Sequence, residues 1–294
     1  MKNVLNNYHP FAAFLPFAAA IVFSMLSFHP VYSAISLLCS IVTALKINGT
    51  KALQLTLRFC LPIFLLTVLI NTAFNKNGMT VLFYVGDRPI LYEGLLFGLC
   101  SAAALSSVLL WFSCYSTIID SEKFLFLTSR ISPTAALLVS MTLGQITLMR
   151  KKIEEIDDAQ TGIYGEERKE FKQKLRLAML KISVLLSWSM EDSVQTADSM
   201  HSRGYGTGRM TKMNPYVFSK KDYWLLSITV LLLTPTLLFI MAGKATFVFY
   251  PITESVQFDA ISIAAYLFYF ILLALPLLVE MKGAVKWHYY ISKV

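Results

Sequence analysis

The sequence predicts an all-α membrane protein, with about six transmembrane helices and a cytoplasmic helical insert between the fourth and the fifth. Composition is the first observation behind this prediction, because 56% of the 294 residues are hydrophobic and only 15% are charged. Soluble domains carry roughly 25% charged residues, whereas the mean hydropathy here is +0.59. The spacing of the apolar runs and the placement of the basic residues are the other two observations.

Apolar runs mark the expected membrane spans, since a helix needs about 20 apolar residues to cross the hydrocarbon core. We expect spans at Pro10–Phe28, Val31–Ile47, Leu53–Ala73, Gly94–Ile119, Tyr223–Ala242 and Ala260–Val279. The first two form a tight hairpin around His29 and Pro30, and the second is short; whether both cross fully is left open. The third has Arg58 near its start and Pro62 as a tolerated kink.

The fourth span is rich in small residues on one side. Small side chains permit close approach of helices, so we expect a buried central helix; these residues are Gly98, Ser101, Ala102 and Ser106. The polar stretch before this span, Asn75–Arg88, contains a short run of extended character at Met79–Val85.

Basic residues gather on the cytoplasmic side of membrane proteins, and their placement orients this chain. With the N-terminus inside and six spans, only Lys76, Arg88 and Lys244 of the 26 Lys and Arg residues lie outside. We therefore expect a multi-pass membrane protein with both termini in the cytoplasm. The positive charge needs no nucleic acid as a partner.

The segment between the fourth and fifth spans is the densely charged part of the chain. It contains two further apolar runs, Ile131–Met149 and Leu175–Met190, but a crossing there would export many basic residues. We expect helices at or below the inner surface, with apolar faces that need a cover. The organisation is then 1–119 for spans one to four, 120–222 for the cytoplasmic helical region, and 223–294 for spans five and six with the tail.

Two long helices are expected in this insert. The first begins at Pro133 after a Ser132 cap and ends at Gly162 and Gly165; the second runs from about Glu166 to Arg203. Gly204 suits the left-handed residue that closes a helix, and Arg203 places a cation at the negative end of the helix dipole. Taken alone, Ser202-Arg203-Gly204 is an ordinary helix stop.

Four stretches resemble a known family in order and spacing over residues 5–280. They are the Asn71 region, Leu91-Tyr92-Glu93-Gly94, Ile156-Asp157-Asp158-Ala159-Gln160, and Ala197-Asp198-Ser199-Met200-His201-Ser202-Arg203-Gly204-Tyr205. The family is the transmembrane T component of energy-coupling factor (ECF) transporters, which includes the corresponding subunit of cobalt and nickel importers. The last stretch is the most specific.

The resemblance implies a scaffold that is not an enzyme, without catalytic residues, metal site or cofactor of its own. Members of the family join two ABC ATPase subunits, which bind the ATP, to a small membrane protein, the S component. That partner captures a vitamin or a transition-metal ion. We therefore expect a T component of an ECF-type ABC importer, which couples ATP hydrolysis to micronutrient uptake within the lipid bilayer.

The resemblance also implies two ATPase-docking sites, because the family carries two short Ala-Arg-Gly-like motifs at coupling-helix ends. The second motif corresponds to Ser202-Arg203-Gly204, with serine in place of alanine. The first corresponds to Ala159-Gln160-Thr161-Gly162, where the arginine is missing. We therefore expect two unequal ATPase contacts, with Arg203 the more important residue.

Methionines on the insert suit an exchangeable apolar partner, because methionine adapts to irregular surfaces. We assign an S-component and coupling-helix surface to Met141, Met149, Met179, Met190 and Met200. Packing between the insert's own helices explains the same residues equally well, so the sequence leaves both interpretations open.

Other function classes fit less well. The histidines and cysteines are scattered, without metal-ligand spacing or a paired-carboxylate pattern inside a span, which disfavours an intramembrane enzyme. A secondary transporter typically has repeated halves and broken midplane helices, and no such symmetry is visible. A conventional ABC permease that forms its own translocation path also docks ATPases through a cytoplasmic helix, and it stays an alternative.

Overall fold

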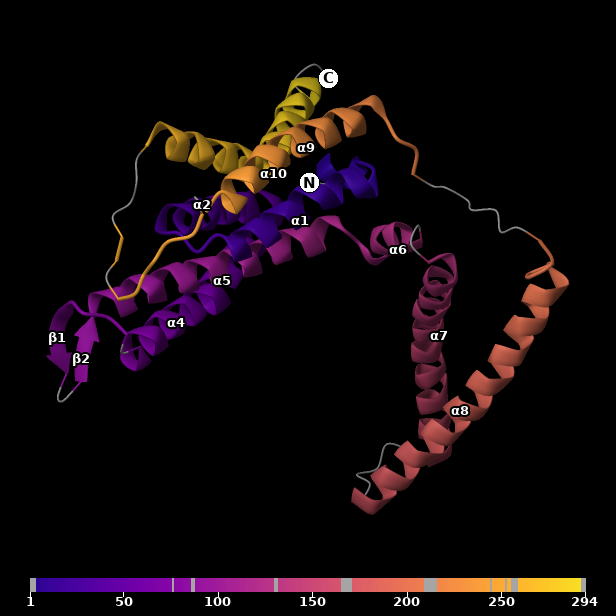
Figure 1. Ribbon diagram of the computed structural model, residues 1–294. Coiled ribbons are helices and arrows are strands. Elements are labelled where there is room, and N and C mark those ends of the chain that lie inside the picture. Colours follow the sequence, from indigo (N-terminus) through magenta and orange to yellow (C-terminus); the bar gives the residue numbers. More distant parts are fainter. Residues whose placement is uncertain are drawn as a thin grey trace. The chain divides into compact units, whose positions relative to one another are not determined.

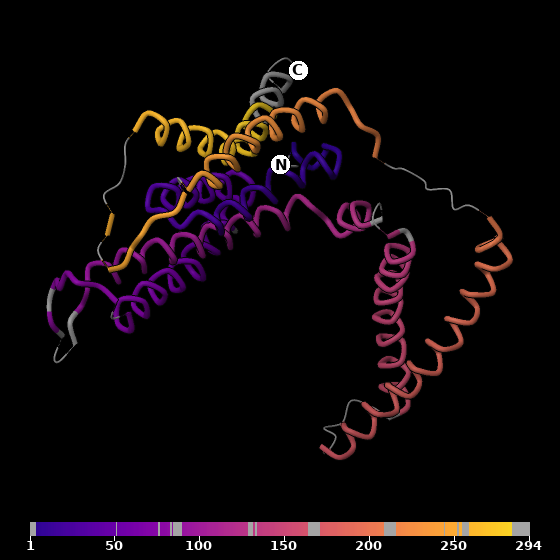
Figure 2. The backbone as a smooth tube through the Cα atoms, viewed as in Figure 1, coloured from indigo at the N-terminus to yellow at the C-terminus, as the bar shows by residue number. Residues whose placement is uncertain are grey.

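The computed structural model describes residues 4–75, 77–85, 88–129, 132–164, 171–208, 216–243, 245–251, 253–254 and 259–291. The protein is mostly helical and divides into two compact units (Figures 1 and 2). Unit 1 comprises Met1–Phe124 with Tyr216–Val294, and unit 2 comprises Leu125–Pro215.

Unit 1 holds the apolar helices. In chain order its elements are the 3-10 helix η1 (Val4–Asn7), α1 (Pro10–Leu26), α2 (Pro30–Asn48), α3 (Thr50–Leu55), the π-helical turn η2 (Thr56–Cys60), α4 (Leu61–Phe74), β1 (Val81–Val85), β2 (Arg88–Leu91), α5 (Tyr92–Ile118), α9 (Lys220–Met241) and α10 (Ala260–Ile291). α6 (Ser121–Ser129) begins in unit 1 and continues into unit 2.

Five helical stretches among the described residues are long and apolar enough to cross a membrane. They are Pro30–Asn48, Ala52–Phe74, Tyr92–Ile118, Lys220–Met241 and Ala260–Gly283. The expected first span is the shorter helix α1, which has 17 residues and ends at Leu26. The expectation that the second run is the short one is therefore wrong, because α2 has 19 residues.

α5 is the central helix of unit 1 and packs against α1, α2 and α4. Its small residues allow this, as predicted: Gly98, Ala102 and Ser106 are buried, and a Cβ on Gly98 would lie 3.3 Å from the Val68 carbonyl oxygen. No residue of α4 is fully buried, which suits a helix that faces lipid on much of its surface.

The third span contains a π-helical turn that the sequence analysis did not foresee. The amide of Leu61 donates to the carbonyl of Thr56, five residues back, and Pro62 follows directly. Proline has no N–H and clashes with the preceding turn of a regular helix, so a widened turn accommodates it. Arg58 lies inside this turn.

The polar stretch before α5 forms an antiparallel hairpin of β1 and β2, the exception to an all-α fold. Val81 pairs with Leu91 and Phe83 with Ile90, with an irregularity between them. The buried Glu93, in the first turn of α5, accepts a hydrogen bond from the Thr80 amide at 3.1 Å and so holds the hairpin to the helix. The extended character predicted for this run is confirmed.

Residues 4–9, which we call the N-terminal clasp, join separate helices at one end of unit 1. The amides of Val4 and Leu5 donate to the two carboxylate oxygens of Glu280 in α10, at 2.9 and 3.2 Å. Glu280 is only 7% exposed, so each oxygen of a buried carboxylate has a backbone donor.

The clasp also contacts the two chain segments that flank unit 2, α6 before it and α9 after it. Lys123 in α6 donates to the carbonyl and side-chain oxygens of Asn6 and, at 3.0 Å, to the Ile118 carbonyl. The His9 amide donates to Asp222 in α9 at 2.9 Å. Burial lowers the pKa of the Lys123 ammonium, and both charged side chains are buried.

Unit 2 consists mainly of two long helices, α7 (Pro133–Tyr164) and α8 (Phe171–Ser202). The predicted start of α7 is confirmed, because the Ala135 amide donates to the Ser132 hydroxyl. Gly162 does not end α7 as predicted, because it lies inside the last turn before Tyr164. One glycine costs only about 1 kcal/mol in a long helix. Gly165 lies outside the described residues.

Candidate functional site

The C-terminal end of α8 is a closed helix stop that presents Arg203. The Gly204 amide donates to the His201 carbonyl at 2.9 Å, and the Tyr205 amide donates to the Met200 carbonyl at 3.0 Å. Gly204 has φ +80°. This pair of bonds with a left-handed glycine is the Schellman arrangement, and it confirms the predicted role of Gly204.

Neighbouring side chains stabilise the same stop. The Ser202 hydroxyl donates to the Asp198 carbonyl at 2.9 Å, and the Thr207 hydroxyl donates to the Gly204 carbonyl at 2.7 Å. Both bonds go to backbone carbonyls, so neither of them involves the Arg203 guanidinium. Arg203 is exposed, and among the described residues it forms no ion pair. Its five N–H donors are therefore directed to solvent or to a partner.

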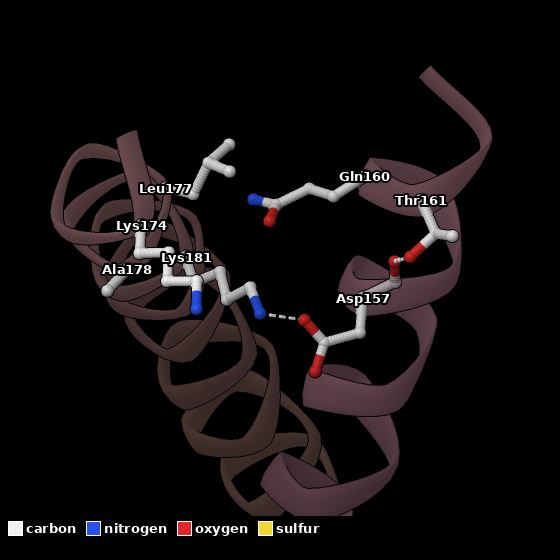
Figure 3. Close-up of a pocket in the computed structure, with 7 residues that line it drawn as sticks. All are labelled: Asp157, Gln160, Thr161, Lys174, Leu177, Ala178 and Lys181. Carbon is white, nitrogen blue, oxygen red and sulfur yellow. Dashed lines mark hydrogen bonds and ion pairs between the residues drawn. The ribbon is translucent and has the colours of Figure 1, made fainter. Parts of the chain in front are cut away.

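The first predicted docking motif has a different environment. Ala159, Thr161 and Gly162 are exposed, but Gln160 is only 9% exposed and faces α8 (Figure 3). The motif lies in the last two turns of α7, which ends at Tyr164, and Gly162 has no left-handed closing conformation of the kind that Gly204 has. The structure thus places Gln160 where α7 meets α8, and Arg203 at a free helix end.

A polar junction that the sequence analysis missed joins α7 and α8. Asp157 forms an ion pair with Lys181, and Gln160 points into the same cavity of about 230 Å³ (Figure 3). Farther along, the Lys152 ammonium lies 6.0 Å from the centre of the Trp188 ring. These contacts form between residues of opposite character on two antiparallel helices. The sequence alone does not show which residue of α7 lies opposite which residue of α8.

α8 also carries an apolar stripe that faces away from this junction. The α8 stripe consists of Leu175, Met179, Ile182, Leu186 and Met190, which are 53–72% exposed. At about 100° per residue, these positions lie roughly 100–180° around the helix from Lys181, whose side chain meets α7. The stripe therefore has no cover within the described part of unit 2, where α8 buries no residue.

The five methionines assigned to one surface thus separate into two groups. Met179 and Met190 lie on the exposed α8 stripe, whereas Met141, Met149 and Met200 are half-buried. The interpretation as internal packing does not fit the first two. For the other three, both interpretations stay open.

No family model matches the chain, and no curated protein matches it. Within the residues that the structure describes, no group of three or more His, Cys, Asp or Glu side chains is placed to hold a metal ion.

Proposed function

We propose that this chain is the transmembrane T component of an ECF-type ABC importer of the bacterial inner membrane. It couples ATP hydrolysis by two ABC ATPase subunits to an S component that captures a vitamin or a transition-metal ion. Unit 1 is the membrane anchor, with α1 as the sixth crossing, and both termini face the cytoplasm. Unit 2 is the coupling insert.

The exposed Arg203 at the closed end of α8 is the observation that carries this proposal. A guanidinium forms a directional, two-pronged contact with a carboxylate, which a lysine does not reproduce. A rigid helix of 32 residues that ends in such a group is suited to carry motion from a groove of a partner protein. The sequence stretch that ends at Tyr205 is also the most specific part of the resemblance to the T-component family.

The α8 stripe supports the second half of the proposal. Contiguous exposed apolar surface on a soluble helix marks a site for another protein or for the membrane. The stripe lies on the same helix as Arg203, so one rigid element connects an apolar surface to the charged end. We assign the stripe to the S component.

The two motifs support unequal ATPase contacts. Gln160 contributes to the junction of α7 with α8, and the exposed neighbours Ala159, Thr161 and Gly162 carry no charge. The α7 contact is therefore the weaker one in this proposal.

Purification of the tagged full chain from native membranes tests the function. We expect ABC ATPase subunits and one small multi-pass membrane protein to be recovered in comparable amounts, as identified by mass spectrometry. A chain that is recovered alone, and that by itself moves a solute across reconstituted vesicles, contradicts the proposal and favours a carrier with its own path.

A further inference from the structure

A cavity of about 410 Å³ lies in unit 1 where the start of α9 meets the end of α10 and the N-terminal clasp. Its volume is within the range of small-molecule sites, about 300–1,000 Å³. Three lysines line the cavity, Lys220 and Lys221 from α9 and Lys282 from α10. Residues far apart in the sequence thus bring three positive charges to one hollow.

These three ammonium groups have no anionic partner in the described residues. Two buried carboxylates that are close to these lysines in the sequence accept hydrogen bonds from the backbone: Asp222 accepts from the amides of His9 and Ser219, at 2.9 and 2.8 Å. Both oxygens of Glu280 accept amides of the clasp, as described above. The positive charge of the lysines is therefore available to an external anion.

The rest of the cavity wall is apolar and aromatic. Trp224, Ile228 and Val279 line it, and Trp224 and Ile228 are 71% and 41% exposed. Lys220, Trp224 and Ile228 follow one another at intervals of four residues, so they lie along one face of α9. The end of the cavity that carries the lysines is thus continuous with an apolar surface, which runs along α9, a candidate membrane span.

We propose that this cavity is a binding site for an anionic phospholipid. The phosphodiester lies among the three lysines, and one acyl chain follows the face of Trp224 and Ile228. Tryptophan is typical of the level of the headgroups, and basic pockets between transmembrane helices bind anionic headgroups. A zwitterionic lipid adds a cation next to the lysines and is disfavoured.

Native mass spectrometry of the delipidated full chain tests this site. The probes are phosphatidylglycerol, phosphatidylcholine with the same acyl chains, and soluble glycerol 3-phosphate. We expect phosphatidylglycerol to bind at least about tenfold more tightly than phosphatidylcholine, and glycerol 3-phosphate not to bind at the same concentration. The triple variant Lys220→Gln, Lys221→Gln, Lys282→Gln is expected to lose this preference.

Two control variants make the result specific. The triple arginine variant at the same positions keeps the charges and is expected to retain the preference. Gln at Lys46, Lys151 and Lys172 removes the same charge from exposed positions elsewhere and is expected to retain it too. The proposal is overturned if the triple Gln variant of the cavity keeps the preference for phosphatidylglycerol, or if the control Gln variant loses it to the same extent. It is also overturned if glycerol 3-phosphate binds as tightly as phosphatidylglycerol. If the triple Gln variant does not fold, Lys282→Gln alone is used, with an expected loss of about fivefold.

Discussion

Arg203→Glu is expected to release the ATPase subunits from the purified complex. The substitution removes the guanidinium and places a negative charge opposite the partner's carboxylate. Loss of one member of a desolvated charged pair costs about 2–5 kcal/mol, which weakens binding at least about 30-fold. Retention of the ATPases on the tagged chain, measured by quantitative mass spectrometry after detergent extraction, gives the result.

Arg176→Glu is the matched control for this substitution. Arg176 is an exposed arginine on the same helix, α8, but near its opposite end. The change of charge is identical, so the control is expected to keep both ATPase subunits. Equal retention in wild type and the Arg203 variant contradicts the assigned role, and equal loss in both variants indicates a general charge effect.

Lys123→Met is expected to loosen the N-terminal clasp and to lower stability. The ammonium donates to two oxygens of Asn6 and to the Ile118 carbonyl, and a methionine of similar length fills the space without a donor. Buried acceptors left unsatisfied cost about 1–3 kcal/mol each. Because Asn6 is only half-buried, its two oxygens cost less than this, and we expect a total loss of about 2–4 kcal/mol. Hydrogen exchange of the Val4 and Leu5 amides is expected to become much faster.

The control for the clasp is Lys46→Met, because Lys46 is an exposed lysine near the end of α2. It is expected to change neither the melting temperature nor amide exchange in the clasp. Unchanged exchange of the clasp in the Lys123 variant shows that this lysine does not hold the segment. The Lys123→Met variant is also expected to weaken the coupling of ATP hydrolysis to uptake, since Lys123 lies where the chain passes from unit 1 to unit 2.

Local signals account for most of the predictions that the structure confirms. Apolar runs of about 20 residues mark α2, α5, α9 and α10 because the cost of burying backbone polar groups leaves few alternatives. Gly204 was predictable as a helix stop because only glycine takes a left-handed conformation without a penalty. The buried face of α5 was readable from its small residues.

Features that depend on distant residues were not predictable in the same way. The clasp joins residues 4 and 280, and the junction of unit 2 joins Asp157 to Lys181; no local pattern specifies either pairing. Gly162 was expected to end α7 and does not, because a single glycine is a weak stop within a long, otherwise favourable helix. The π-helical turn before Pro62 depends on how the chain relaxes around a missing donor.

Site-specific photo-crosslinking from position 205 tests the central claim most directly. Tyr205 is 40% exposed and adjoins the stop that presents Arg203, so a photoreactive phenylalanine analogue there leaves Arg203 in place. The same analogue at Phe171, 81% exposed at the opposite end of α8, is the control. We predict a covalent adduct with an ABC ATPase subunit from position 205 and none from position 171. An ATPase adduct from position 171 alone, or no ATPase adduct from position 205, would contradict the account.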